Sequence, residues 1–232
     1  SQVIGEMIGI PAERIGGFLH WTEAMVALPE GKTQAEAIKN PAASIYAEFA
    51  RLLEERRRER RGDLMSALID AHIDGEALSQ EELLGFCFVL VVAGNDTTTN
   101  LIANGAVLLA EHPEQRRLLA QDPTRLPDAI EEMLRYEAPA QALPRRLTRD
   151  VTLHGETLRE GEQLFLLWGS ANRDEREFED ADRFDVRRRI KRHLGFGQGV
   201  HFCLGKSLAR LEARVAFEEL LARAPEYELA GP

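Results

Sequence analysis

Cysteine is scarce in this 232-residue sequence, which contains only Cys87 and Cys203. Two cysteines are too few for the disulfide framework that stabilises many small secreted domains. Sparse cysteine is typical of proteins in a reducing compartment, where a thiolate survives as a ligand. We therefore expect a cytoplasmic protein.

The sequence also lacks a long apolar run and a signal segment. Its longest apolar run, residues 83–93, is much shorter than the roughly 20 residues of a membrane-spanning helix. No charged and apolar leader opens the chain, so we expect no membrane partner. Residues 1–11 have neither an initiator methionine nor a helix cap and read as the interior of a helical layer. A preceding N-terminal part is therefore expected to be missing.

An excess of basic residues is absent as well. The chain has 29 basic and 39 acidic residues, and its formal charge of −10 disfavours binding to nucleic acid. One arginine-rich stretch, residues 54–61, interleaves glutamates and contains no aromatic residue, so it is interpreted as a solvated helix end rather than a nucleic-acid site. A hydrophobic content of 44% and a charged content of 29% favour one large globular domain over two small ones.

Helix signals dominate the chain. Capping boxes at 33–36 and 79–82 and a cap at Asp63 each precede an apolar stretch with helical spacing. The longest predicted helix runs without a proline from Glu81 to about His112. Further helices are predicted at 11–28, 33–61, 64–69, 113–121, 128–136 and 204–223, and the last of these is expected to bury Leu208, Leu211, Val215 and Leu220. Residues 144–168 read as short strands, and the predicted fold class is mainly α with a minor β-sheet.

The most informative segment is the glycine-rich loop Phe-Gly-Gln-Gly-Val-His-Phe-Cys-Leu-Gly at residues 196–205, which leads into the final helix. Gly197 and Gly199 allow a positive φ and a close approach to a bulky partner, while Gly205 frees space on the first helical turn. A helix N-terminus lowers the pKa of a nearby thiol, which suits Cys203 to serve as an anionic ligand, with iron as the natural metal. The alternative is a buried small hydrophobe between two apolar neighbours.

The pattern Phe-Gly-x-Gly-x-His-x-Cys-x-Gly, followed by Leu-Ala-Arg at 208–210, resembles the haem-ligand loop of the cytochrome P450 family. The resemblance implies that Cys203 is the metal ligand, the proximal thiolate of the iron of haem b (iron protoporphyrin IX). It also implies cofactor contacts from Phe196, Gly197, Gly205, His201 and Arg145, the last two to haem propionates. A histidine bonded to a backbone carbonyl and an arginine contact from the neighbouring Arg146 are the alternatives for these two.

A polar interruption of the longest helix resembles the oxygen-binding segment of the same family. Residues 93–100, Ala-Gly-Asn-Asp-Thr-Thr-Thr-Asn, place small and polar side chains where a core helix favours leucine. The resemblance implies that Ala93 and Gly94 leave room over the haem and that Asp96 and Thr97 form a catalytic acid–alcohol pair that delivers protons. The residues alone are equally consistent with a kink stabilised by threonine hydroxyls.

Glu132 and Arg135 lie three residues apart and therefore share one helix face. The resemblance implies a structural ion pair that is completed by Arg183, whereas a weak surface pair is the base-rate alternative. Residues 170–185 resemble the segment of this family known as the meander. We expect the meander to brace the cysteine loop.

A basic run at residues 187–192 directly precedes the cysteine loop of this otherwise acidic sequence. Together with Lys206 and Arg210, the run is predicted to form a docking face for an acidic electron-transfer protein. A solvated loop without a partner is the alternative. The resemblance implies a ferredoxin or flavodoxin with an NAD(P)H-dependent reductase as the electron source, because the sequence contains no reductase motif.

The resemblance extends over residues 1–232, which are interpreted as the C-terminal haem-binding portion of a single cytochrome P450 domain. The implied fold is the cytochrome P450-like fold lacking its N-terminal part. The implied activity is a monooxygenase that inserts one atom of O₂ into a small apolar organic substrate. The alternative is a truncated haem-binding or partner-activating module without independent turnover.

Overall fold

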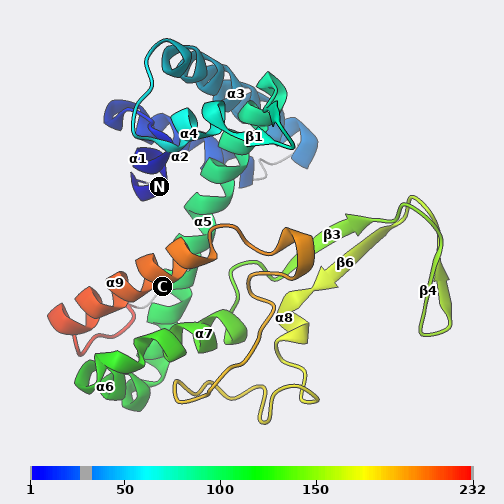
Figure 1. Cartoon of the computed structure of the whole chain (residues 1–232). Helices are drawn as coiled ribbons and strands as arrows, with labels where there is room; N and C mark the ends of the chain where they lie inside the picture. The colour runs from blue at the N-terminus through cyan, green and yellow to red at the C-terminus, as the bar shows by residue number, and fades with distance from the viewer. Residues whose placement is uncertain (1, 27–32, 231–232) are drawn as a thin grey trace. The chain divides into compact units, whose positions relative to one another are not determined.

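The computed structural model describes residues 2–26 and 33–230 (Figure 1). The described chain is mainly α-helical, with three small two-stranded antiparallel sheets. This confirms the predicted fold class. The chain divides into two compact units, Ser1–Asp96 and Thr97–Pro232, which are described separately. The predicted end of the helix at residues 11–28 lies outside the described residues.

The first unit is built from helices. Its elements are α1 (Gln2–Ile8), α2 (Ala12–Val26), α3 (Gln34–Arg58), α4 (Leu64–Asp70), the hairpin strands β1 (His72–Ile73) and β2 (Glu76–Ala77), and the first half of α5 (Gln80–Glu111). The predicted capping boxes form, because Thr33 and Ser79 each bond reciprocally with a glutamate three residues later. The predicted cap also forms, since the Asp63 carboxylate accepts from the backbone N–H of Ser66 at 2.9 Å. These caps fix where the helices begin.

The arginine-rich stretch is not uniformly solvated, and that part of the sequence interpretation is wrong. Arg56 is buried, with 1% of its surface exposed. Its Nε donates to Asp63 Oδ2 at 2.6 Å, and its Nη2 donates to the backbone oxygen of Gly9 at 2.7 Å. Arg56 falls one helical turn after the buried Leu52, so the apolar face of α3 continues into it. The buried ion pair ties α3 to the start of α4.

The second unit holds the second half of α5 and the remaining elements. They are α6 (Pro113–Gln121), the 3-10 turn η1 (Pro123–Arg125), α7 (Leu126–Tyr136), strands β3 (Ala142–Arg146), β4 (Val151–Leu153), β5 (Glu156–Leu158) and β6 (Gln163–Leu167), α8 (Trp168–Ala171), the 3-10 turn η2 (Gly199–His201) and α9 (Lys206–Arg223). Helices α7 and α9 pack side by side (Figure 1). Gly105 of α5 permits close packing here, since a Cβ would lie 2.5 Å from Phe217 Cζ and 2.7 Å from Met133 Sδ.

Helix α9 only partly buries the residues that the sequence predicts: Leu208 and Leu220 are partly buried, and Leu220 packs against the core. Its buried residues are Ala213, Phe217 and Leu221, which recur every four residues. Leu211 and Val215 are instead about half exposed within the described chain, at 48% and 46%. The helix carries apolar residues on more than one side, so its periodicity does not define a single core face.

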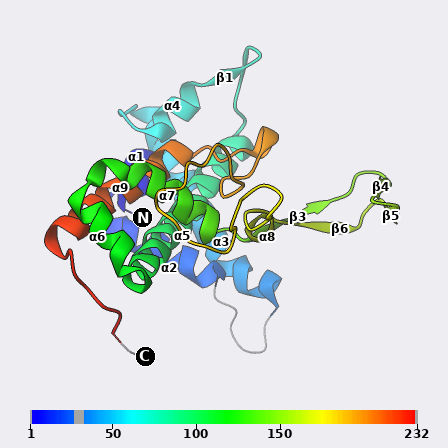
Figure 2. The ribbon, with the colours of Figure 1, turned by 90° about the horizontal axis from the view of Figure 1, so that it is seen from below.

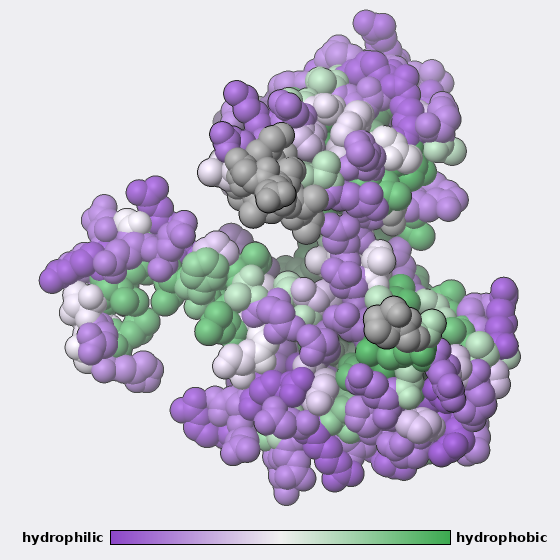
Figure 3. Space-filling model, turned by 180° about the vertical axis from the view of Figure 1, so that it is seen from behind, coloured by the Kyte–Doolittle hydropathy of each residue, from purple (hydrophilic) through white to green (hydrophobic). Residues whose placement is uncertain are grey.

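The strands form two nested antiparallel pairs: β3 pairs with β6, and the β4–β5 hairpin between them in sequence lies beyond their far ends (Figure 2). The first of these strands, β3 at Ala142–Arg146, begins two residues before the strand region predicted at 144–168. Apolar side chains gather on the β3–β6 hairpin (Figure 3), where Phe165 and Leu167 are more than half exposed. Arg145 pairs with Leu164 across the ladder, on the opposite face from Phe165.

Helix α5 runs unbroken through residues 80–111, so the polar segment at 93–100 does not break it. By length and composition α5 could cross a membrane, although the central helix of a water-soluble protein passes the same test. This single helix is therefore weak evidence for a membrane location.

Candidate functional site

The cysteine loop joins the meander to α9. The backbone N–H of Cys203 donates to the Phe196 oxygen at 2.9 Å, and the N–H of Gly197 donates to the Leu194 oxygen at 2.9 Å. Between them, η2 is closed by a bond of 3.0 Å from the Phe202 N–H to the Gly199 oxygen. These bonds fold the loop back on itself and hold the partly exposed Cys203 in a fixed place.

The loop depends on its glycines, as the sequence predicts. Gly197 has φ +70° and Gly199 has φ +72°, both in the left-handed region that favours glycine. Gly197 is also buried, and a Cβ there would lie 3.4 Å from Trp168 Cζ2. At Gly205 a Cβ would lie 3.9 Å from Cys203 Sγ, which is an ordinary van der Waals contact. Glycine is therefore required by the backbone at Gly197 and Gly199, but not by crowding at Gly205.

The two cysteines sit in different surroundings. Cys87 is fully buried, and desolvation, with a smaller contribution from the charge of Asp63, raises the pKa of its thiol to about 11. Cys203 is only partly buried and lies two residues before Gly205, the N-cap of α9. The interpretation of Cys203 as a fully buried hydrophobe is therefore wrong, and Cys203 is the accessible sulfur.

The donor set indicates what kind of metal centre Cys203 could hold. Among the described residues, no group of three histidine, cysteine, aspartate or glutamate side chains could hold a metal ion. A single thiolate can hold iron firmly only when the remaining ligands arrive with the metal, as the four nitrogens of a porphyrin do. Cys203, a single partly exposed thiol just before the start of α9, fits such a prosthetic group.

Beneath the loop lies a charged cluster that the sequence analysis did not identify. The Glu131 carboxylate of α7 accepts from Arg210 Nε at 2.6 Å and from Arg210 Nη2 at 2.8 Å, and His193 Nε2 lies 3.0 Å from Glu131 Oε2. Burial alone would raise the pKa of Glu131, but the hydrogen bonds from Arg210 and His193 outweigh it and lower the pKa to about 2. Glu131 is therefore ionised and tied to both sides of the loop.

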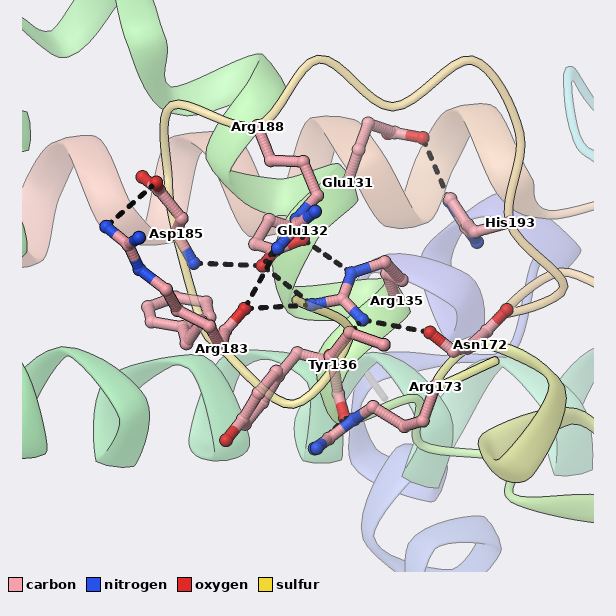
Figure 4. A network of polar contacts seen from close by, with 12 residues as sticks. Glu131, Glu132, Arg135, Tyr136, Asn172, Arg173, Arg183, Asp185, Arg188 and His193 are labelled. Carbon is pink, nitrogen blue, oxygen red and sulfur yellow. Dashed lines mark hydrogen bonds and ion pairs between the residues drawn. The ribbon is translucent and has the colours of Figure 1, made fainter. Parts of the chain in front are cut away.

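Glu132 and Arg135 form a completely buried ion pair (Figure 4). Arg135 Nε donates to Glu132 Oε2 at 2.7 Å and Arg135 Nη2 donates to Oε1 at 2.9 Å, so the contact is bidentate. Both side chains are 0% exposed. The predicted structural pair is confirmed and the surface alternative is wrong.

Arg188, and not Arg183, completes the pair, which corrects the sequence assignment. Arg188 Nε lies 3.3 Å from Glu132 Oε2, whereas the Arg183 side chain is 65% exposed and lies 3.6 Å from Asp185. Arg183 contributes its backbone oxygen, which accepts from Arg135 Nη2 at 3.2 Å. The cause is the turn of the chain around Phe184, a buried residue that anchors the backbone and leaves the preceding arginine outside.

The meander braces the cysteine loop as expected. Arg135 Nη1 donates to the backbone oxygens of Asn172 and Ala181 at 2.9 and 2.7 Å. The Asn172 side-chain oxygen then accepts from the backbone N–H of Leu194 at 2.7 Å, two residues before the loop begins. The buried pair in α7 is thus linked through Asn172 to the residues just before the loop, and the step from Arg135 to Asn172 is visible in Figure 4.

The basic run is largely neutralised by carboxylates of the same unit. Its arginines pair as Arg187 with Asp185, Arg188 with Glu132, Arg189 with Asp128 and Arg192 with Glu177. Lys191 is exposed, and the Lys206 ammonium lies 4.4 Å from the centroid of the Phe202 ring. The net positive charge of the predicted docking face is therefore smaller than a count of its basic residues indicates.

The predicted oxygen-binding residues divide between the units. Ala93, Gly94 and Asp96 belong to the first unit, and Thr97 begins the second. In the first unit a Cβ on Gly94 would lie 3.2 Å from Ile4 Cγ1, so the glycine makes room for α1. The buried Asn95 donates to Thr22 Oγ1 at 2.8 Å and to Asp96 Oδ1 at 3.1 Å. These bonds orient the Asp96 carboxylate.

Within the second unit, the structure brings Phe196, Gly197, His201, Cys203 and Gly205 together in one loop. His201 is exposed on η2. Arg145 lies on β3, where its Nη1 donates to the backbone oxygen of Pro144 at 2.9 Å, and Arg146 beside it is exposed. The propionate roles of these side chains remain predictions.

Comparisons with known proteins extend over nearly all of the chain. The family model described as cytochrome P450 matches residues 27–223. The chain is 42% identical to cytochrome P450 130 of Mycobacterium tuberculosis, over 99% of this chain and 58% of that protein. It is also 42% identical to the mycinamicin IV hydroxylase/epoxidase of Micromonospora griseorubida, over 100% of this chain and 58% of that enzyme.

The solved structures give the same match. The crystal structure of CYP109E1 from Bacillus megaterium in complex with corticosterone superposes with a TM-score of 0.88 at 38% identity. The superposition includes 98% of this chain and 62% of that one. The chain thus spans about three fifths of the length of the proteins that it resembles.

Proposed function

The chain belongs to the cytochrome P450 family, and from this premise we propose that the protein containing it is a haem-thiolate monooxygenase. The proposed reaction inserts one oxygen atom of O₂ into a small apolar organic substrate. Cytochrome P450 proteins bind haem b, and haem, when bound, supplies the iron centre at which O₂ is activated with electrons from a redox partner. The observation that carries the proposal is the partly exposed Cys203 in its glycine loop.

Cys203 is the proposed proximal ligand. Its backbone is fixed by Phe196, and a positive guanidinium, that of Arg210, is near enough for its charge to interact with the sulfur. The loop therefore offers the Cys203 sulfur as a ligand without needing to rearrange.

Asp96 and Thr97 are the proposed proton-handling pair. The carboxylate of Asp96 is oriented by Asn95, and the threonine hydroxyl can donate and accept a hydrogen bond at the same time. A carboxylate followed by a hydroxyl can pass a proton from solvent to a reacting oxygen. Ala93, with no side chain beyond Cβ, would leave room beside the cofactor, whereas the space at Gly94 is taken by Ile4 of α1.

Arg145 and His201 are proposed to hold the haem propionates. The guanidinium can bind a carboxylate through two parallel hydrogen bonds, and the exposed imidazole can donate one. Phe196, Gly197 and Gly205 would line the thiolate side of the cofactor. Mycinamicin IV, in the name of one relative, and corticosterone, in complex with another, support a predominantly apolar organic substrate for this protein.

A ferredoxin or flavodoxin, reduced by an NAD(P)H-dependent reductase, is the proposed electron source in a cytoplasmic protein. Lys191, Lys206 and the exposed arginines of residues 187–192 are the proposed contact residues. Arg210, predicted as part of the same face, is instead paired with Glu131. Their pairing with carboxylates leaves a modest attraction, so the docking face would affect the association rate more than affinity.

A second candidate is a haem-binding or partner-activating module without turnover. The observation in its favour is that the chain spans about three fifths of its relatives' length. We propose that residues 1–232 form the haem-binding portion of one domain, and the two candidates differ in whether this portion turns over without further chain. Product formation by the isolated haem-loaded chain would favour the monooxygenase, and haem binding without product would favour the module.

The deciding experiment is the CO-difference spectrum of the reduced, haem-loaded protein. We expect the red-shifted band of a thiolate-ligated haem. Cys203→Ala should abolish this band, whereas Cys87→Ala, the matched control, should retain it. An unchanged band in the Cys203 variant would overturn the proposed function.

A further inference from the structure

The Glu131 carboxylate is contacted by two side chains from other segments, those of His193 and Arg210. Glu131 lies on α7, Arg210 lies on α9 and His193 lies in the approach to the cysteine loop. Arg210 makes two parallel bonds, of 2.6 and 2.8 Å, to the carboxylate. The N–H of Gly195 donates to His193 Nδ1 at 2.9 Å, which assigns the ring proton to Nε2 and makes His193 a donor to Glu131. The carboxylate is held from two directions.

A chain of direct contacts links the cluster to the backbone of Cys203. The Arg210 guanidinium carbon lies 4.5 Å from the centroid of the Phe196 ring. Phe196 in turn accepts the backbone hydrogen bond from Cys203. Any displacement of the guanidinium would therefore disturb the residue that fixes the ligand's backbone.

The cluster also interacts electrostatically with Cys203. The pKa of Arg210 is raised by its hydrogen bond to Glu131 and, against the opposing effect of burial, by Coulomb attraction to Glu131 and to Cys203. The guanidinium is partly shielded from water, with 36% of its side chain exposed, so screening is incomplete. One positive and one negative charge are thus fixed near the ligand.

We propose that Glu131 is a positioning residue that holds the Arg210 guanidinium against Phe196, and that the two opposed charges together set the reduction potential of the iron ligated by Cys203. This inference rests on the proposed haem-thiolate function. A positive charge near the metal favours the reduced state, which carries one more electron, and a negative charge disfavours it. Removing the positive charge of Arg210 should therefore lower the reduction potential, and removing the negative charge of Glu131 should raise it.

The test is a spectroelectrochemical titration of the haem-loaded protein. Glu131→Gln leaves Arg210 uncompensated and is expected to raise the midpoint potential. Arg210→Gln leaves Glu131 uncompensated and is expected to lower it. The double variant should return towards the wild-type value, because both charges are gone. A purely structural role would lower stability in all three variants but would not give shifts of opposite sign.

Two further variants sharpen the result. Arg214→Gln removes the same charge one turn further along α9, where Arg214 lies 3.9 Å from Glu218 and is half exposed, and it should leave the potential unchanged. Arg210→Lys keeps the charge but cannot form the two parallel bonds. It should shift the potential in the same direction as Arg210→Gln but by less, and this comparison carries the test if Glu131→Gln fails to fold.

Several outcomes would overturn the inference. They are shifts of the same sign in both single variants, no shift in either with the thiolate spectrum intact, or a shift in Arg214→Gln as large as that in Arg210→Gln. A wild-type protein without the thiolate spectrum would overturn the proposed function and this inference with it.

Discussion

The Arg188 guanidinium reaches Glu132 across 56 residues of sequence, with Arg188 Nε 3.3 Å from Glu132 Oε2. Glu132 is 0% exposed and also pairs with Arg135, so one buried carboxylate is shared by two cations. Its Oε1 additionally accepts from the backbone N–H of Asp185 at 2.9 Å. The carboxylate is the point at which α7 and the chain leading to the cysteine loop are joined.

Glu132→Ala is expected to lower the free energy of unfolding by roughly 3–5 kcal/mol, because it leaves Arg135 as an uncompensated buried charge. Urea denaturation of the haem-free protein measures the change. Glu54→Ala is the matched control, since its pair with Arg57 has the same spacing but is exposed, and it should cost only about 0.2–1 kcal/mol. Equal stability of the Glu132 variant and the parent would contradict the role of the pair.

Arg188→Ala should destabilise the protein by about 1–3 kcal/mol, because it removes a partner of a buried carboxylate. Arg183→Ala should be nearly neutral, because that side chain points to solvent and contributes only its backbone oxygen. The same urea measurement compares the two variants. A larger loss in the Arg183 variant would restore the assignment made from sequence.

Thr97→Ala in a haem-loaded protein that turns over is expected to divert electrons to peroxide without loss of haem. Asp96→Asn should slow the reaction by on the order of 10²-fold or more, the contribution typical of a positioned acid or base. The ratio of product to NAD(P)H consumed measures the first effect. Thr99→Ala, two residues further along α5, is the control and should retain coupling. Identical coupling in wild type and Thr97→Ala would contradict the proposed proton pathway.

The ion pair between Glu131 and Arg210 should make the stability of the fold depend on pH. The folded-state pKa of Glu131 is about 2, below its ordinary value of 4.5. The pair therefore stabilises the fold fully above about pH 4.5, and this contribution is lost as the pH falls towards 2. Glu131→Gln should be less stable than wild type at pH 7 and should show a shallower acid loss over this range. Parallel stability curves for the two proteins would count against the pair.

Charge reversal at Lys191 and Arg189 should slow reduction by an acidic ferredoxin several-fold at low salt. The difference should fade as salt shortens the screening length from about 10 Å at 0.1 M to about 3 Å at 1 M. Arg188 is unsuitable for this test, because it pairs with buried Glu132. Lys39→Glu, an exposed change in the first unit, is the control, and reduction by dithionite should be unaffected throughout. Salt-independent reduction of all variants would leave the docking face without support.

The local patterns were the predictable part of this structure. The capping boxes and the glycine loop depend on residues close in sequence, so their spacing was sufficient to place helix starts and the positive-φ glycines. The spacing of Glu132 and Arg135 predicted a shared face, and the family resemblance predicted its burial. These features could be identified before any coordinates.

The long-range partners were not predictable from one sequence. Arg183 and Arg188 are both arginines of the same segment, and the choice between them depends on how the backbone turns at Phe184. Glu131 and His193 likewise looked like ordinary polar residues, because their partner Arg210 is 79 residues away from Glu131. The helical spacing of Arg56 from Leu52 indicated that Arg56 is buried, since it continues the buried face of α3. The surrounding run of charged residues instead favoured a solvated helix end.

The hydrogen bonds of Arg135 to the meander all end on backbone oxygens, those of Asn172, Ala181 and Arg183. Because every residue type carries a backbone carbonyl, these contacts place no demand on the identity of the side chains there. At Ala181 and Arg183 the side chain can therefore vary while the path of the chain is preserved, whereas Asn172 is also needed for its side-chain bond to Leu194. The requirement lies instead on α7, where Arg135 must be retained because it donates all of these hydrogen bonds to the meander.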